Sequence, residues 1–160
     1  QELSLAKPLS VAENVLVGQL PTKNGVVQWK EAIKRAKEIL TEVGLEHIDP
    51  MIEISELPQH EAQLIEIGKA MSNNPDILVM DEPTSALDPI ATKHIEELLL
   101  ELQKEVTILI VTHNMGQAMR ISSKSMFMYL GELVEYDDTQ KMFSDPKDER
   151  TKAYLTGKMG

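Results

Sequence analysis

Two adjacent carboxylates, Asp81 and Glu82, directly follow the apolar run of residues 77–80. This run, bounded by Asp76 and Asp81, predicts a strand that is buried on both faces. Since open α/β sheets bind ligands at the carboxyl ends of their strands, the two acids occupy a candidate site. Asp81 suits a Mg²⁺ ion or its water ligands, and Glu82 suits orienting or deprotonating a water molecule. For an isolated Asp-Glu pair, the alternative is a solvated acidic turn after a core strand.

A second apolar run, residues 106–112, ends directly before His113. One strand–helix–strand unit separates it from the two acids, and a right-handed crossover places both strand ends on the same edge of a parallel sheet. A neutral imidazole there could hydrogen-bond a terminal phosphate or an attacking water. Alone, a histidine after a strand is more often a helix cap or a structural hydrogen-bonding group. Together with Asp81 and Glu82, His113 becomes a candidate catalytic residue.

The composition is that of one soluble globular chain. Its 160 residues are 42% hydrophobic and 26% charged, with a net charge of −10. This negative charge argues against a general polyanion-binding surface, so no nucleic-acid partner is predicted. Cysteine is absent, which excludes disulfides, a thiol nucleophile and a thiolate metal site. No apolar run approaches the roughly 18 residues of a membrane-spanning helix, so we expect membrane association to go through a partner.

Helices are expected first along the chain. Ser10 and Glu13 have the spacing of a capping box and predict a short helix that ends near Gly18. Trp29 begins an apolar pattern of helical period that stops before Gly44. We expect Trp29 to anchor this helix in the core.

Two domains follow from the change in pattern at residues 73–75. A third helix is expected over about residues 57–73, and residues 21–25 are expected to be a loop, so residues 1–73 are predicted to be helical without strands. Residues 74–160 are predicted to be α/β. The elements expected there are strands at 77–81 and 106–112, a helix begun by Asp88 and Pro89, a short helix at 114–121, a hairpin around Gly131-Glu132, and two short helices after residue 139.

The residues 77–88, Ile-Leu-Val-Met-Asp-Glu-Pro-Thr-Ser-Ala-Leu-Asp, resemble the Walker B segment and D-loop of ATP-binding-cassette (ABC) transporter ATPases. Thr112-His113-Asn114 is similar to the H-loop of that family, and the opening Gln-Glu-Leu-Ser-Leu is similar to its Q-loop. The resemblance implies an α/β fold: part of a P-loop NTPase (RecA-like) core with parallel strands, after an ABC-type helical subdomain. It implies ATP and Mg²⁺ as cofactors. The implied roles are catalysis for Glu82 and His113, Mg²⁺ binding for Asp81 and Gln1, and nucleotide binding for Gln1, Asp81 and Asp88.

The two halves of the chain resemble different importers. Residues 1 to about 80 are similar to ribose- or xylose-type sugar importers, and the chain from Asp88 onward is similar to the phosphate importer. The resemblance implies an ATPase subunit that drives import, with phosphate favoured as cargo and sugar as the alternative. It also implies a second ATPase subunit and transmembrane permease subunits as partners, at the cytoplasmic face of the membrane. A different P-loop ATPase, such as a DNA-repair ATPase, is disfavoured by the importer-like opening and by the acidic charge.

Two departures from the family pattern stand out. No G-x-x-x-x-G-K-[ST] occurs in the 160 residues, so the P-loop and its strand are expected to be absent and the chain is expected to be a fragment. The family signature Leu-Ser-Gly-Gly-Gln appears as Leu57-Pro58-Gln59-His60-Glu61, which stands where the family contacts nucleotide. Proline has neither a hydroxyl nor an N–H, and Glu61 adds negative charge near phosphate, so we expect a weakened signature. A non-hydrolysing docking module is therefore the alternative function.

We predict that a polypeptide of these 160 residues alone does not hydrolyse ATP, because a P-loop supplies the N–H cradle and the lysine for the β- and γ-phosphates. The measurement is phosphate release, with the Glu82→Gln variant as the control. Turnover well above that of the variant would refute this prediction.

Overall fold

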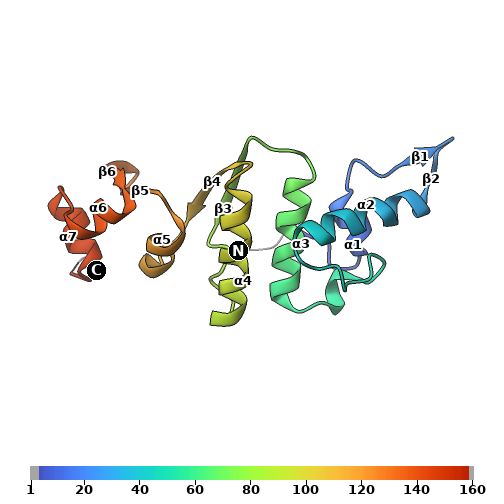
Figure 1. Cartoon of the computed structure of the whole chain (residues 1–160), viewed down its shortest axis with the longest axis horizontal. Coiled ribbons are helices and arrows are strands. Elements are labelled where there is room, and N and C mark those ends of the chain that lie inside the picture. Colours follow the sequence, from blue (N-terminus) through green and yellow to red (C-terminus); the bar gives the residue numbers. More distant parts are fainter. Residues whose placement is uncertain (1–3, 159–160) are drawn as a thin grey trace. The chain divides into compact units, whose positions relative to one another are not determined.

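The computed structural model describes residues 4–158, which form two compact units that meet at the Ile110–Val111 bond (Figure 1). The first unit holds α1 (Val11–Val15), β1 (Thr22–Lys23), β2 (Val26–Val27), α2 (Trp29–Glu42), the 3₁₀ helix η1 (Ile54–Glu56), α3 (Gln59–Met71), β3 (Ile77–Asp81), α4 (Pro89–Leu102) and most of β4 (Thr107–Val111). The second unit holds α5 (Met115–Ile121), β5 (Lys124–Tyr129), β6 (Glu132–Asp138), α6 (Thr139–Ser144) and α7 (Glu149–Leu155). This division concerns packing, and the functional boundary expected at residue 73 stays a prediction.

The helix ends follow the local capping signals. Ser10 accepts from the Glu13 amide and Glu13 accepts from the Ser10 amide, so the predicted capping box of α1 is formed. The Ser10 hydroxyl also donates to Oε2 of Glu13 (2.6 Å), and this bond, together with that from the Ser10 amide, holds the pKa of Glu13 below its ordinary value. Gly44 has φ of 74° directly after the end of α2, as expected for a helix stop.

The first 73 residues are not strand-free, which corrects the prediction. Thr22 pairs with Val27 and Lys23 with Val26 in an antiparallel hairpin around Asn24-Gly25. Both turn residues have positive φ, 52° and 79°, which is the geometry of a two-residue hairpin turn. The Asn-Gly pair was the sequence signal for this hairpin.

Trp29 is not a core residue, contrary to expectation. It begins α2 beside the hairpin and is 40% exposed. The apolar face of α2 that does reach the core begins one turn later and comprises Ala32, Ala36, Ile39 and Leu40. The apolar pattern predicted the helix correctly, but it did not predict which of the apolar residues are covered by another element.

Helices α2 and α3 pack closely at Gly68. A Cβ atom at this position would lie 2.9 Å from Cγ2 of Ile39 and 3.3 Å from Cγ1 of Val43. The buried Ile65 and Ile67 of α3 flank this contact, which forms the centre of the helical core. A glycine is needed here because the two helices leave no room for a side chain.

Asn14 joins the segment before α1 to the helix itself. Its side chain is buried, accepts from the Ala6 amide (2.7 Å), and donates to the carbonyls of Ala6 (3.1 Å), Leu9 (3.3 Å) and Ser10 (2.9 Å). Asn14 is therefore the hydrogen-bond partner of the Ala6 amide, and it adds a second donor to three carbonyls that already accept from the Leu9, Ile54 and Asn14 amides.

Strands β3 and β4 form a two-stranded sheet in the described chain. The Thr107 amide at the start of β4 donates to the carbonyl of Asp76, directly before β3, so the strands run in the same direction. The prediction that β3 is buried on both faces was wrong. Leu78 and Met80 are buried, whereas Ile77 and Val79 are exposed, and no residue of β4 itself is fully buried.

The second unit is built on the β5–β6 hairpin, whose turn is Leu130-Gly131 rather than the expected Gly131-Glu132. Both turn residues have positive φ, 50° and 81°. Phe127 of β5 stacks on Tyr154 of α7, with ring centroids 4.8 Å apart. The two short helices expected after residue 139 are confirmed as α6 and α7.

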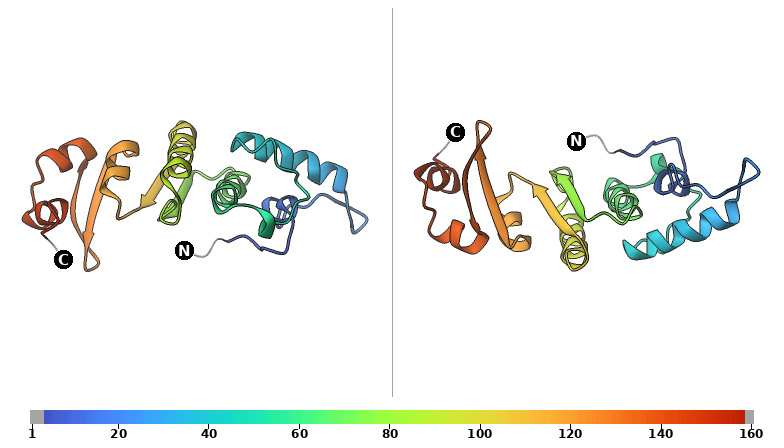
Figure 2. Two further views of the ribbon diagram at one scale, coloured as in Figure 1. Left: turned by 90° about the horizontal axis from the view of Figure 1, so that it is seen from below. Right: turned by 90° about the horizontal axis from the view of Figure 1, so that it is seen from above.

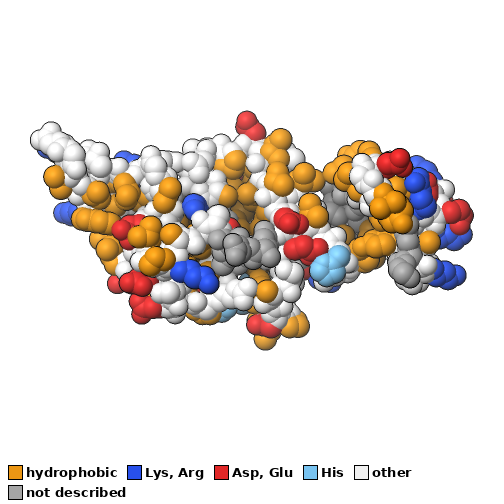
Figure 3. Space-filling view, turned by 180° about the vertical axis from the view of Figure 1, so that it is seen from behind, with side chains coloured by type: hydrophobic (Ala, Val, Ile, Leu, Met, Phe, Trp, Pro, Cys, Tyr) orange, Lys and Arg blue, Asp and Glu red, His pale blue; other side chains and the backbone are white. Residues whose placement is uncertain are grey.

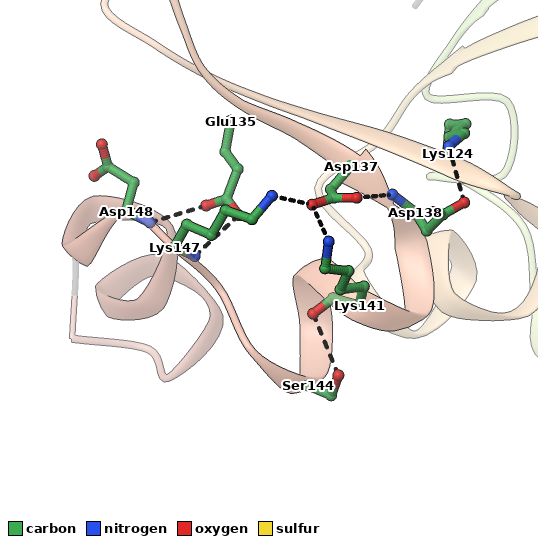
Figure 4. Close-up of polar contacts among 8 residues, drawn as sticks. All are labelled: Lys124, Glu135, Asp137, Asp138, Lys141, Ser144, Lys147 and Asp148. Atoms are coloured by element: carbon green, nitrogen blue, oxygen red, sulfur yellow. Dashed lines mark hydrogen bonds and ion pairs between the residues drawn. The ribbon is translucent and has the colours of Figure 1, made fainter.

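Two carboxylates of β6 tie the hairpin to the following helices (Figure 4). Asp137 forms ion pairs with Lys147 and with Lys141 (3.1 Å), and it accepts a hydrogen bond from the Asp138 amide. Together these three interactions hold the pKa of Asp137 well below its usual range. Burial opposes ionisation of Glu135, but the amides of Lys147 (3.0 Å) and Asp148 (3.2 Å) donate to it and its pKa is still lowered. The start of α7 is fixed by these bonds.

We predict that Asn14→Ala lowers the free energy of unfolding by about 1–3 kcal/mol, because the Ala6 amide loses its partner and three carbonyls each lose one of two hydrogen bonds. Urea unfolding followed by circular dichroism measures this. The control is Gln103→Ala, an exposed amide in the same unit, for which we expect a change within about 0.5 kcal/mol. Equal stability of the two variants would contradict a structural role for the Asn14 network.

Candidate functional site

The candidate site begins at the end of β3, where Asp81 is the last strand residue and is exposed. Glu82 follows with φ of 48° and is half-buried. The amide and the hydroxyl of Ser85 both donate to the Glu82 carbonyl, at 3.2 and 3.1 Å. The chain therefore turns sharply at Glu82, and this turn fixes the position of the Glu82 Cα atom, from which the side chain extends.

A positive φ is uncommon for a residue other than glycine and costs conformational energy. Such strain is found most often at binding and catalytic positions, where the surrounding structure maintains it. Sequence analysis selected Glu82 by type and position but contained no sign of this backbone conformation. The strain is an independent observation in favour of a functional Glu82.

Asp88 caps α4, as predicted. Its Oδ1 atom accepts from the amides of Ile90 (2.8 Å) and Ala91 (3.0 Å), and Pro89 occupies the first helical position. The Ala91 and Ile90 hydrogen bonds hold the pKa of Asp88 below its ordinary value, with a smaller contribution from the charge of His60. One carboxylate oxygen is thus used structurally, and the nucleotide-binding role of Asp88 stays a prediction.

The segment Leu57–Glu61 lies at the junction of η1 and α3. Leu57 ends η1, and Pro58 stands at the N-cap of α3 without a side-chain hydrogen bond to the helix. Gln59 and His60 begin the helix, and the largely buried Glu61 lies 3.2 Å from Nε2 of the exposed His47. The observed N-cap is consistent with the expected loss of the signature serine hydroxyl, because proline offers no side-chain oxygen.

Sequence analysis missed two residues of α3, Glu66 and Lys69. The Ser4 amide donates to Oε1 of Glu66 (2.7 Å), and the Lys69 ammonium donates to the Ser4 carbonyl (2.9 Å). These bonds hold the chain just after the predicted Q-loop residue Gln1, which itself lies outside the described residues. The sequence signal that could have identified these two residues is their opposite charge at a spacing of three positions on one helix.

A cavity of about 290 Å³ lies between α3 and β3 in the first unit. Ser4, Glu66 and Lys69 line its polar side, while Met80 and Pro83 line the side nearest the candidate site. The cavity therefore adjoins the backbone that precedes Asp81 and follows Glu82.

His113 lies in the second unit, in the exposed connection between β4 and α5. The Asn114 amide donates to Oγ1 of Thr112 (3.0 Å), and Oδ1 of Asn114 accepts from the Gln117 amide (3.0 Å). Hydrogen bonds formed by the residues before and after His113 thus hold the backbone conformation of this connection. Its catalytic role stays a prediction.

The donor chemistry of Asp81 fits a magnesium ligand. Among the residues that the structure describes, no group of three or more His, Asp or Glu could hold a metal by itself. Mg²⁺ commonly takes one or two carboxylates and completes its shell with phosphate oxygens and water, so a single exposed Asp81 suffices on the protein side.

In the same described part, no helix is long and apolar enough to cross a membrane.

A family model described as ABC transporter matches residues 1–85, which include Asp81 and Glu82. The Phosphate import ATP-binding protein PstB 1 of Bacillus licheniformis is 46% identical over 156 residues, covering 96% of this chain and 60% of the relative. The Phosphate import ATP-binding protein PstB of Bacteroides thetaiotaomicron is 47% identical over 156 residues, covering 96% and 61%. The chain thus spans about 60% of the length of these relatives.

Two solved structures are similar in fold. One is the ADP conformation of MJ1267, an ATP-binding cassette of an ABC transporter, with a TM-score of 0.73 and 26% identity over 91% of this chain and 63% of that one. The other is the dimeric structure of a post-hydrolysis state of the ATP-binding cassette MJ0796 bound to ADP and Pi, with a TM-score of 0.69 and 28% identity over 87% and 60%. The predicted α/β fold class is confirmed.

We predict that the stabilising effect of the Asp88 charge disappears in acid. Because the folded-state pKa is lowered, this contribution is complete above the ordinary value near pH 4 and is lost as pH falls through the folded value. Melting temperatures of the wild type and Asp88→Asn are compared from neutral pH to about pH 2. Asparagine keeps the cap without the charge, so their difference should shrink in acid; a constant difference would contradict the prediction.

Proposed function

Because the chain belongs to the ABC transporter family, we propose that it forms part of the ATP-binding subunit of an importer that couples ATP hydrolysis to transport. The observation that carries this proposal is the strand–turn–helix unit of β3 and α4. It presents Asp81 and the strained Glu82 at a strand end, within the segment that the family model matches. Strand ends are where open α/β sheets bind their ligands.

Each acid takes a separate role in the proposal. Asp81, with Gln1, would hold Mg²⁺, an ion that would offset the negative charge of the ATP phosphates. Glu82 would accept a proton from the attacking water, and the half-buried turn would keep its carboxylate in place. His113 would hydrogen-bond the terminal phosphate.

A second ATPase subunit is the proposed partner at the segment Leu57–Glu61. The similar cassette MJ0796 is dimeric in its post-hydrolysis state, which supports a paired arrangement for this family member. The carboxylate of Glu61 and the missing hydroxyl at Pro58 would weaken contact with a phosphate across such an interface. Transmembrane permease subunits are the further proposed partners, and they would place the protein at the cytoplasmic face of the membrane.

Phosphate is the proposed cargo. Relatives named as phosphate import proteins align with 96% of the chain, so the alignment extends into the first half, for which a sugar importer was expected. PstB of Methylobacillus flagellatus, 55% identical over 100 residues, adds support. Sugar import stays the alternative prediction, and a docking module without hydrolysis is the alternative outcome of the experiment below.

The test joins this chain to the P-loop-bearing amino-terminal portion of a PstB relative. We predict that Glu82→Gln lowers ATP turnover by about 10²–10⁴-fold while ATP binding is retained, because glutamine keeps the size and loses the base. Binding of a fluorescent ATP analogue and phosphate release are measured in parallel.

Asp76→Asn is the matched control, since Asp76 lies before the opposite end of β3. It should leave both binding and turnover unchanged. Parallel loss of binding and turnover in Glu82→Gln would assign Glu82 to nucleotide binding instead, and absence of turnover in the joined wild type would favour the docking module.

A further inference from the structure

The β1–β2 hairpin and the first turn of α2 form an exposed surface that the cassette function does not use. Figures 1 and 2 show the hairpin extending past the amino-terminal end of α2. We call the exposed side chains Lys23, Val26, Trp29, Lys30 and Lys34 the hairpin patch. All of them belong to the first compact unit.

The hairpin patch exposes large apolar groups at the end of a projecting element. Val26 is 65% exposed and Trp29 is 40% exposed. Trp29 and Lys30 line an open hollow with Val27 and Lys34, so the indole and the two ammonium groups belong to one continuous surface. In Figure 3, hydrophobic side chains and Lys or Arg side chains lie next to one another over this end of the unit.

The charge of the hairpin patch is opposite to that of the chain. The net charge is −10, yet no Asp or Glu occurs from residue 14 to residue 30. Lys23 and Lys30 form no ion pair within residues 4–158. The neighbouring Glu31 is paired with Arg35 at 2.9 Å, and Lys34 has only a long contact with Glu38 at 3.9 Å. The patch therefore carries a local excess of positive charge.

Two other exposed apolar surfaces of the described residues have acidic neighbours instead. Ile77 and Val79 of β3 lie between Asp76 and Asp81, so their surroundings are acidic. The exposed face of the β5–β6 hairpin, which includes Leu133, adjoins Glu132. The hairpin patch differs because its apolar groups are flanked by lysines.

We propose that the hairpin patch binds the surface of an anionic lipid bilayer. Tryptophan is favoured at the membrane–water interface because its ring is apolar and its N–H is polar. Lysines beside it would contact lipid phosphates, each adding about a fivefold gain in partition. The acidic remainder of the chain opposes this only weakly, because charges farther than about 10 Å from the surface are screened at physiological salt.

This proposal does not depend on ATP binding or on the importer assignment. It requires only the hairpin, α2 and a lipid surface, so vesicles without permease or nucleotide test it. Failure of vesicle binding would leave the nucleotide chemistry of Glu82 untouched, and failure of ATP turnover would leave the lipid contact untouched.

The sequence supplies its own probe, because Trp29 is the one tryptophan of the chain. The whole chain is mixed with vesicles of phosphatidylcholine alone or of equal parts phosphatidylcholine and phosphatidylglycerol. With the anionic vesicles we expect a blue shift of Trp29 emission, quenching by brominated acyl chains, and co-sedimentation that weakens as salt is raised. With phosphatidylcholine alone we expect little binding.

Lys23→Glu with Lys30→Glu should lower binding to the anionic vesicles by at least about tenfold, because two attractive charges become repulsive. The control, Lys93→Glu with Lys104→Glu on and after α4, makes the same change in net charge at a different surface and should bind nearly as the wild type does. Circular dichroism verifies that both variants fold.

The proposal would be overturned by no emission shift at low salt, by equal binding to neutral and anionic vesicles, or by equal loss in the two double variants. A hairpin patch that binds an acidic protein but no vesicle would also overturn it.

Discussion

The hydrogen bonds of the buried Asn14 side chain hold together the part of the first unit on which the helices depend. They satisfy backbone groups of residues 6–10, and the same segment exchanges backbone bonds with the loop before α3. The Val11 amide donates to the Ile52 carbonyl, and the Ile54 amide donates to the Leu9 carbonyl. Without the Asn14 side chain, the Ala6 amide would lose its protein partner, and the carbonyls of Ala6, Leu9 and Ser10 would each keep one hydrogen bond instead of two. The position at which α3 begins follows from this connected pair of loops.

The candidate site is determined by backbone geometry more than by contacts between acidic side chains. The left-handed conformation of Glu82 turns the chain out of β3, and the Asp88 cap fixes where α4 begins. These two constraints lie near the two ends of residues 81–88, and they define the backbone where it leaves the strand and where it enters the helix. A strained residue held at both ends is pre-organised, which is what positioning a water molecule requires.

Local patterns in the sequence were enough to predict several helix boundaries and to select the candidate catalytic groups. Capping by Ser10 and Asp88 and the stop at Gly44 depend on side chains and glycine geometry within a few residues, so their patterns sufficed. Asp81 and Glu82 were identified by residue type and by their place after an apolar strand. The change from helical to strand patterns near residue 75 predicted an α/β arrangement for residues 74–160, and the resemblance to ABC ATPases implied the fold class.

Which apolar residues are covered, and which polar groups meet, depends on the packing of elements that lie far apart in the sequence. Hydrophobic periodicity identifies an apolar face but not the element that packs on it, so the exposure of Trp29 and of alternate residues in β3 could not be predicted. The bonds of Ser4 to α3 join residues more than 60 positions apart and depend on the packing of the whole helical core. The φ of Glu82 likewise could not be predicted, because local preference alone disfavours a positive φ for glutamate.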